Sequence, residues 1–379
     1  MLDIDIDRCS ACSACIHSCP TEAISQIKNE NGFLLPYIDT EICIDCGICD
    51  EVCDFIREKV TESNIRQAFS LEIRNREDMY NSTSGGAFTA LSDIILERRG
   101  YIVGAIMDEG FNVRHIITQT REGRNLMRGS KYVQSDMGDL MPEIKQLLED
   151  DNYVMYVGTP CQTAGLLSFL GKDYPKLYVI DFLCHGVPNN ELFKSHIEFV
   201  QKSYKDKIED YTFRDKRHSW NPTSPQGIKV KNKFMYPFKN QSYLSPFFSS
   251  NYSLRDACYN CKYRSHYRYS DITIADFWAI EKFTQKKNNK GVSLVLANSD
   301  KGQELMKGVK QSSKLQEYPV KDILFRVSTT PVKGRNREEF WKLYHEQGYE
   351  AVCDKYVDKS AYRRLRFAVK KIVKRQHRI

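Results

Sequence analysis

The residues of this 379-residue chain best suited to chemistry are its 13 cysteines, eight of which lie within the first 60 residues. Those eight form an internal repeat with the spacing C-x2-C-x2-C-x3-C in each half. The first set comprises Cys9, Cys12, Cys15 and Cys19. The second set, displaced by 34 residues, comprises Cys43, Cys46, Cys49 and Cys53. Thiolates at such close and regular spacing are typical ligands of metal centres.

The run of four cysteines is the pattern of bacterial ferredoxins that hold two 4Fe–4S clusters. In that pattern three close cysteines bind one cluster, and the fourth crosses to the other cluster. The predicted ligand sets are therefore Cys9, Cys12, Cys15 and Cys53 for one cluster, and Cys43, Cys46, Cys49 and Cys19 for the other. Zinc is the alternative, although four-cysteine zinc sites more often use two C-x2-C pairs. Pro20 follows the first run, whereas Asp54 follows the second.

Four further cysteines lie in the remainder of the chain and could form one more ligand set. Cys161 and Cys184 follow two apolar segments, "YVMYV" and "LYVIDFL", that read as buried strands. Cys258 and Cys261 form the C-x2-C of "CYNC". Strand ends at one edge of a sheet commonly meet at a site, which favours Cys161 as a ligand. A structural zinc site, unrelated buried cysteines and a reactive nucleophilic thiol remain alternatives. Cys353 has no partner in the sequence.

The elements that would position these thiols read as a mixed α/β domain over residues 61–340. "STSGGAFTALSDIILERRG" predicts a capped helix that ends at Gly100. Residues 101–118 predict a β-hairpin, while "DITIADFW" and "VSLVLAN" predict further strands. We therefore expect a ferredoxin-type domain over residues 1–60, fused to this mixed-sheet domain, and a basic helical tail over 341–379.

Seven motifs follow one another along the chain: "STSGG", "GSKYVQS", "VGTPCQTAGL", "FLCHGVPN", "FRDKRHSW", "CYNCKYR" and "DITIADFWAI". In this order they resemble the beta subunit of the coenzyme F-420-reducing hydrogenase family. Relatives in this family include bacterial reductases with a fused ferredoxin head and the plant hydroxymethyl-chlorophyll reductase. The resemblance covers roughly residues 1–340. One departure is that Ala275 and Ala279 stand where the family usually has glycines.

The resemblance implies FAD and a third 4Fe–4S cluster on Cys161, Cys184, Cys258 and Cys261. The residues themselves add modest support, because a capped helix start offers free N–H groups to a phosphate. His185 could hydrogen-bond the cofactor or serve a structural role, and Lys131 could neutralise a pyrophosphate or be solvated. The flavin-binding candidates are Ser84, Gly85, Gly86, Lys131, Gly158, Thr159 and His185.

The charge of the chain is unevenly distributed, although its net value is only +7. Residues 1–60 carry 12 acidic and 4 basic side chains, a balance of −8, whereas residues 361–379 carry 8 basic and no acidic ones. This distribution and the lack of a recognition motif argue against a nucleic-acid partner. The tail places Leu365, Val369, Ile372 and Val373 on one helical face, which could contact anionic lipid or an acidic partner.

The first residues, "MLDIDIDRCS", lack the basic and apolar segments of a signal peptide, and no apolar run has transmembrane length. We therefore expect a cytoplasmic protein whose thiols are ligands rather than disulfides. The predicted function is an iron–sulfur flavoprotein reductase that takes single electrons from a ferredoxin-like donor. Its acceptor would be a deazaflavin or a small organic substrate. A non-catalytic electron-transfer subunit and a zinc-stabilised binding module are the alternatives.

Overall fold

The structure is a computed structural model of the chain. It describes residues 6–217, 220–221, 224–237, 243–244, 248–278, 280–283, 289–327 and 331–356. The predicted amphipathic face at residues 365–373, most of the predicted tail and Ala279 lie outside these residues.

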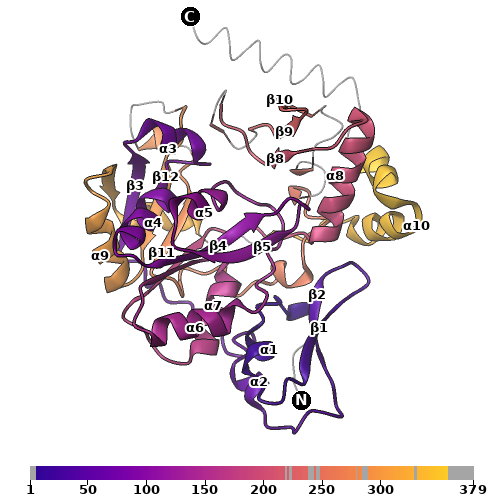
Figure 1. Ribbon diagram of the computed structural model, residues 1–379, viewed down its shortest axis with the longest axis horizontal. Helices are drawn as coiled ribbons and strands as arrows, with labels where there is room; N and C mark the ends of the chain where they lie inside the picture. The colour runs from indigo at the N-terminus through magenta and orange to yellow at the C-terminus, as the bar shows by residue number, and fades with distance from the viewer. Residues whose placement is uncertain are drawn as a thin grey trace, which may run out of the picture.

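The N-terminal segment, residues 6–56, forms a small head that repeats its backbone as well as its sequence (Figure 1). Strand β1 (Ile24–Lys28) pairs antiparallel with β2 (Leu34–Ile38), and short helices α1 (Ala14–Ser18) and α2 (Ile48–Glu51) follow the cysteine loops. Both helices begin after a residue with positive φ: Ser13 (70°) before α1 and Gly47 (76°) before α2. The repeated cysteine spacing therefore builds the same loop and turn twice.

An eight-stranded mixed sheet forms the centre of the described part of the chain. Its strand order is β13 (Ser313–Tyr318), β3 (Gln67–Ile73), β12 (Ser293–Ala297), β11 (Ile272–Asp276), β7 (Leu177–Phe182), β6 (Val154–Val157), β4 (Tyr101–Met107) and β5 (Val113–Thr118). Strands β4, β6, β7 and β11 are mutually parallel, while β5, β12, β3 and β13 each run antiparallel to a neighbour. The fold class is thus mixed α/β, as predicted.

Helices cover both faces of this sheet because its central strands are apolar on both sides. Val154 and Tyr156 of β6 pack in the cluster that contains α6 (Leu140–Glu149) and α7 (Pro160–Leu170). Met155, between them in sequence, packs on the opposite face with α4 (Ala87–Glu97) and α9 (Asp300–Gly308). The shorter helices α3 (Arg76–Asn81) and α5 (Arg121–Leu126) flank α4.

A second, three-stranded sheet packs beside the first and has a core of its own (Figure 1). It consists of β8 (Asp210–Thr212), β9 (Gly227–Val230) and β10 (Lys233–Met235). Helix α8 (Asn190–Tyr204) lies between this sheet and α10 (Arg337–Tyr356), which is broken by a non-helical Gly348. Cys353 is buried on α10. Helix α10 spans the predicted start of the tail at residue 341. The two predicted domain boundaries stay predictions.

The remaining described elements are short 3-10 turns: η1 (Ile6–Arg8), η4 (Asp256–Cys258), η5 (Ile280–Lys282), η6 (Val320–Asp322) and η7 (Leu324–Arg326). Among the described helices, none is long and apolar enough to cross a membrane.

The parallel strands that precede the predicted body site end at one edge of the large sheet. The carboxyl ends of β6, β7 and β11 lie at the same edge of the sheet because these strands are parallel. Ser293, at the start of antiparallel β12, pairs with Asp276 at the end of β11 and so lies at that edge too. The predicted hairpin, helix and buried strands are confirmed at β4–β5, α4, β6, β7, β11 and β12. Helix α4, however, has no side-chain cap and ends at Glu97 rather than at Gly100.

Candidate iron–sulfur and flavin site

Four head cysteines surround one pocket, and we call them the inner head group: Cys9, Cys12, Cys15 and Cys53. The loop between Cys9 and Cys12 turns inward, and the Ala11 N–H donates to Cys9 Sγ at 3.3 Å. Burial raises the pKa of the free Cys12 thiol to about 12. A thiolate at this position therefore needs a cation, such as cluster iron, to take its charge.

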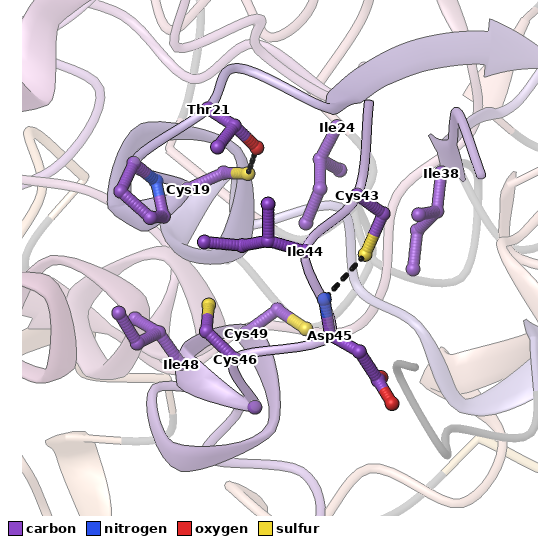
Figure 2. Close-up of a pocket in the computed structure, with 12 residues that line it drawn as sticks. Cys19, Thr21, Ile24, Ile38, Cys43, Ile44, Asp45, Cys46, Ile48 and Cys49 are labelled. Carbon is purple, nitrogen blue, oxygen red and sulfur yellow. Dashed lines mark hydrogen bonds between the residues drawn. The ribbon is translucent and has the colours of Figure 1, made fainter. Parts of the chain in front are cut away.

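The other four head cysteines surround a second pocket, and we call them the outer head group: Cys19, Cys43, Cys46 and Cys49. Figure 2 shows their side chains, with Cys19 Sγ 3.7 Å from Thr21 Oγ1 and Cys43 Sγ accepting from the Asp45 N–H at 3.4 Å. The Asp45–Cys43 bond repeats the Ala11–Cys9 bond of the inner group, 34 residues earlier. Cys46 is exposed, as is the neighbouring Ile44, which keeps 64% of its accessible surface.

The two pockets divide the cysteines as the crossing pattern requires. Cys53 from the second run lies with three cysteines of the first run, and Cys19 lies with three of the second. The donor sets are all thiolate and fit 4Fe–4S clusters. The assignment of each cysteine to a cluster stays a prediction that this grouping supports.

The body cysteines also lie together, at the carboxyl edge of the sheet, and we call them the body group: Cys161, Cys184, Cys258 and Cys261. Cys161 occupies the second position of α7, directly after β6, and Cys184 follows β7. Thr159 caps α7 in a capping box with Gln162, and its hydroxyl lies 3.1 Å from Cys161 Sγ.

The thiols of the body group lie close enough to raise one another's pKa. Besides burial, Cys161 and Cys261 raise the pKa of the Cys184 thiol, and all three other cysteines raise that of Cys258. Burial first, then these neighbours, raises the pKa of the Cys184 thiol to about 12 and that of Cys261 to about 11. Within the described residues no three His, Cys, Asp or Glu side chains converge closely enough to hold a single metal ion. A cubane binds each thiolate at a separate iron corner and so suits thiols that are grouped but apart.

The inner head group packs directly on the body group. Cys53, Cys161 and Cys261 share one apolar cluster with Phe55 and Tyr263. Helix α7 approaches closely because Gly165 has no side chain: a Cβ there would lie 2.7 Å from Cys12 Sγ. The head therefore touches the same helix that carries Cys161 in its first turn.

Asp54, the residue that departs from the ferredoxin pattern, also serves this interface. Its carboxylate lies 3.0 Å from Lys262 Nζ and accepts from Tyr263 Oη at 2.7 Å. All three side chains are buried or nearly so, and Lys262 and Tyr263 directly follow Cys261. A buried carboxylate with both partners in place fixes the head against the body.

The predicted phosphate seat at Ser84, Gly85 and Gly86 is partly occupied by the protein itself. The Gly85 N–H donates to Ser293 Oγ at 3.0 Å, and the Ser84 hydroxyl donates to the Val292 carbonyl at 2.8 Å. Gly85 is required by packing, because a Cβ there would collide with the Leu71 carbonyl on β3. Gly86 has φ 89° and begins α4 without any side-chain cap, so the first turn of this 11-residue helix remains suited to an anion.

Lys131 lies close to this helix start but its amine is already engaged. Its Nζ donates to the carbonyls of Leu126, Met127 and Arg128 at 2.8–3.2 Å and so caps the end of α5. Burial lowers its pKa to about 7. The neighbouring Ser130 N–H donates to Thr83 Oγ1 at 3.0 Å, which joins the "STSGG" and "GSKY" motifs.

The remaining flavin candidates stand at the ends of β6 and β7. Gly158 gives room to the Tyr156 ring, since a Cβ there would lie 2.5 Å from Tyr156 Oη. His185 pairs with Asn251 at 2.7 Å and lies 5.0 Å from the Phe248 ring. Burial lowers its pKa, which keeps the imidazole neutral near pH 7. These roles are structural; flavin contact at these residues stays a prediction.

A group of side chains at the same edge was not singled out from the sequence. Trp220 and Trp278 stack with ring centroids 4.4 Å apart, and Arg214 lies over the Trp278 ring. Asp276 accepts from Arg214 at 2.6 Å and from Trp220 Nε1 at 3.0 Å. Lys216 donates to the Ser84 carbonyl at 2.7 Å, and burial lowers its pKa to about 8. The motifs "FRDKRHSW" and "DITIADFW" contained these residues, but only the fold brings them together.

Known proteins match the chain in two segments. Residues 8–56 match the 4Fe-4S dicluster domain, and residues 151–323 match the family described as the C terminus of the coenzyme F420 hydrogenase/dehydrogenase beta subunit. A coenzyme F420-dependent sulfite reductase of Methanocaldococcus jannaschii is 28% identical over 192 residues, covering 49% of this chain and 29% of that protein. The F subunit of the F(420)H(2) dehydrogenase of Methanosarcina mazei is 23% identical over 194 residues, covering 48% and 54%. The chain thus spans about a third and about half of these two relatives.

A solved structure of the F420-reducing [NiFe] hydrogenase complex from Methanosarcina barkeri contains a similar chain. The match has a TM-score of 0.47 and 17% identity, and it covers 78% of this chain and 94% of the other. The segment matches, together with the four-cysteine groups, relate the chain to iron–sulfur redox proteins. Residues 151–323 of the chain are thus similar to the C terminus of coenzyme F420 hydrogenase/dehydrogenase beta subunits, and its head matches a 4Fe-4S dicluster domain.

Proposed function

We propose that this chain is a flavin-dependent reductase that joins a one-electron donor to a two-electron acceptor. The observation that carries the proposal is the order of the thiol groups. The outer head group is exposed at Cys46, the inner head group packs on the body group, and the body group lies at the carboxyl edge of the sheet. Bound clusters would supply one-electron transfer, and bound FAD would collect two electrons for release as a pair.

The protein holds the inner head group and the body group close together by direct contacts. Gly165 lets α7 approach Cys12, and the Asp54–Lys262 pair fixes the head beside Cys261. Short separations between neighbouring centres are what electron transfer through a protein needs. The 12 cysteines of the three groups account for every cysteine of the chain except Cys353.

We propose that FAD binds at the carboxyl edge, with its pyrophosphate at the start of α4. The uncapped first turn of α4 and the cationic side chains of Arg214 and Lys216 at this edge favour an anionic cofactor. The stacked Trp220 and Trp278 rings offer a flat aromatic surface. Lys131 would support this site indirectly, by capping the end of α5, because its amine is not free to bind the pyrophosphate.

The donor would approach the outer head group. Ile44 and Cys46 are exposed there, and the exposed charged residues of this loop and of α2, Glu41, Asp45 and Glu51, are acidic. We therefore propose a reduced ferredoxin or a similar one-electron donor whose contact surface is basic. For the acceptor we propose a deazaflavin or a small organic substrate, because the names of two relatives contain coenzyme F420.

A second candidate is a non-catalytic electron-transfer subunit of a larger complex. The name of one relative, which is a subunit of a dehydrogenase, favours it. A purified chain that reduces no small molecule but remains bound to another protein would select this candidate.

The proposal is tested by anaerobic purification of the full chain with iron, sulfide and flavin quantified per polypeptide. Three clusters and one flavin predict about 12 irons, about 12 sulfides and about one FAD. About 8 irons would show that the body group holds no cluster. A chain with 12 irons and no flavin after reconstitution with FAD would reject the flavin but not the electron-transfer role.

A further inference from the structure

Arg255 is a buried arginine that lies where the head meets the body. Only 3% of its surface is exposed. Its Nη1 donates to the Cys9 carbonyl at 3.1 Å and its Nη2 to the Leu34 carbonyl at 2.9 Å, both in the head. Its Nε donates to Gln134 Oε1 at 2.8 Å, and its own carbonyl accepts from the Cys258 N–H at 3.0 Å. The Arg255 side chain thus touches the inner head group, and its backbone carbonyl bonds Cys258 of the body group.

The charge of Arg255 has no carboxylate partner in the described part of the chain. The adjacent Asp256 is engaged by Arg337, whose Nη2 lies 2.8 Å from its carboxylate. Burying a guanidinium without a counter-charge is costly, so arginines this deeply buried are almost always paired. Burial lowers the pKa of Arg255, and the groups that oppose this shift when ionised are, in order, the thiols of Cys9, Cys258 and Cys161, followed by the Asp256 carboxylate. The Phe33 ring lies 5.0 Å from the guanidinium carbon.

Those three thiols come from two different predicted clusters. Cys9 belongs to the inner head group, while Cys258 and Cys161 belong to the body group. A 4Fe–4S cluster with four thiolates carries net negative charge and gains one more negative charge when it takes an electron. A fixed cation close to both clusters would compensate that charge, most strongly where water is excluded.

We propose that Arg255 is the shared counter-ion of the inner head cluster and the body cluster, and that its charge raises their reduction potentials. The proposal rests on the proposed function for the clusters themselves. In this role Arg255 is a positioning residue: it exchanges no electron, but it makes the one-electron reduced state of each neighbouring cluster more stable. It would thereby keep both clusters reducible by the same donor.

The test is a redox titration of the full chain, followed by electron paramagnetic resonance, with dithionite supplying one electron to each cluster. Arg255→Gln removes the charge and retains an amide that can donate hydrogen bonds. At a fixed applied potential we expect the reduced-to-oxidised ratio of at least one cluster to fall about tenfold, which is a drop of 59 mV for one electron. Arg255→Lys keeps the charge, so its reduced-to-oxidised ratio at the same applied potential should lie within about threefold of the parent ratio.

Two further variants separate charge from structure. Gln134→Glu leaves Arg255 and its bonds to Cys9 and Leu34 in place but sets a carboxylate against the guanidinium, so it should lower the potential in the same direction. The double variant Asp256→Asn with Arg337→Gln is the matched control: it removes a buried ion pair near Cys258 without changing the net charge, and it should leave the potentials near the parent values.

Iron content distinguishes the ways in which the experiment can end. If the parent chain contains no iron, the proposed function fails. If the parent and Arg255→Gln both keep their iron and have equal potentials, the role of Arg255 is rejected and the proposed function stands. If Arg255→Gln loses iron, Gln134→Glu decides, and parent potentials in that iron-loaded variant overturn the inference.

Discussion

Cys161 shows how a single position can favour a ligand over a free thiol. It lies in the first turn of α7, where the helix dipole favours a thiolate, and its Sγ is 3.1 Å from the Thr159 hydroxyl. Burial acts in the opposite direction and raises the pKa of the uncomplexed thiol. An isolated Cys161 would therefore be protonated and unreactive at neutral pH, so a nucleophilic role is less favourable than ligation.

We predict that Cys161→Ser lowers the iron content by about a third, from about 12 to about 8 per chain. Serine is similar in size to cysteine and leaves the Thr159 cap of α7 in place, but it is a poor ligand for cluster iron. Iron quantification and resonance spectra after anaerobic purification are the measurement, and the signals of the head should remain. Cys353→Ser is the control, because Cys353 is buried on α10 outside the three groups. Equal iron in the parent and Cys161→Ser would exclude Cys161 as a ligand.

The residues that sequence reasoning found and those that it missed differ in the range of their contacts. The head cysteines were grouped from spacing alone, because their loops are local and repeated. Arg255 was missed because its acceptors in the head, Cys9 and Leu34, are 246 and 221 residues away and are backbone carbonyls. A carbonyl carries no sequence signature, and Asp54 likewise meets Lys262 only after folding.

At the scale of elements, α8 shows how a buried histidine can set a pH limit on packing. His196 lies between the hydroxyls of Tyr349 on α10 and Tyr211 on β8, at 2.9 and 3.2 Å. Burial lowers its pKa to about 3, from an ordinary value of 6.5. Above pH 6.5 the histidine is neutral in both the folded and the unfolded chain, so its titration has no effect on stability there. Below pH 6.5 only the unfolded chain takes up the proton, and stability is lost progressively toward pH 3.

We predict that the α8–α10 region loses about 1.4 kcal/mol of stability between pH 7.5 and pH 5.5 through His196 alone. His196→Gln can still bond the tyrosines but does not titrate, so its loss over this range should be smaller by that amount. Amide hydrogen exchange in α8 and α10, corrected for the intrinsic pH dependence of exchange, measures the difference. Using the same variant pair cancels the contribution of His115, which is also buried. Identical losses in the parent and the variant would contradict the prediction.

The elements themselves were largely predictable, whereas their order in the sheet was not. Buried strands such as β6 and β7 are recognisable as short apolar runs before Gly/Pro turns. No local sequence pattern indicates that β11 lies between β7 and β12, or that β3 lies between β12 and β13. The head is likewise predictable as a unit, but its packing against α7 is not. That contact needs a glycine at position 165, because a larger residue there would collide with Cys12.

At the scale of the whole molecule, the three cysteine groups form a series that leads from the exposed head to the sheet edge. Only the inner head group touches the body group among the contacts of the described residues, through Cys53, Cys161 and Cys261. The outer head group lies beyond it, with Cys46 exposed. The head is therefore expected to receive electrons from outside rather than to release product.

We predict that Cys43→Ser, which damages the outer head group, slows reduction of bound FAD by reduced ferredoxin or a dye donor. Reoxidation of already reduced FAD by the acceptor should stay near the parent rate, because the head takes no part in that half-reaction. Anaerobic stopped-flow of the two half-reactions, measured separately, is the test. Reduction at the parent rate would show that electrons do not enter through the head, and the proposed series would have to be redrawn.

The spread of the body cysteines has a consequence for how the protein is made. Every predicted cluster ligand of the two head groups lies between residues 9 and 53, so we expect the head to fold and to be loaded while the ribosome is still producing the body. The body group draws Cys161 and Cys184 from the ends of β6 and β7, and Cys258 and Cys261 from the segment that precedes β11. Its site exists only after this last parallel strand has paired with β7, a late and non-local event. When iron is scarce, newly made chains should therefore accumulate with filled heads and empty bodies, able to accept electrons but unable to pass them on.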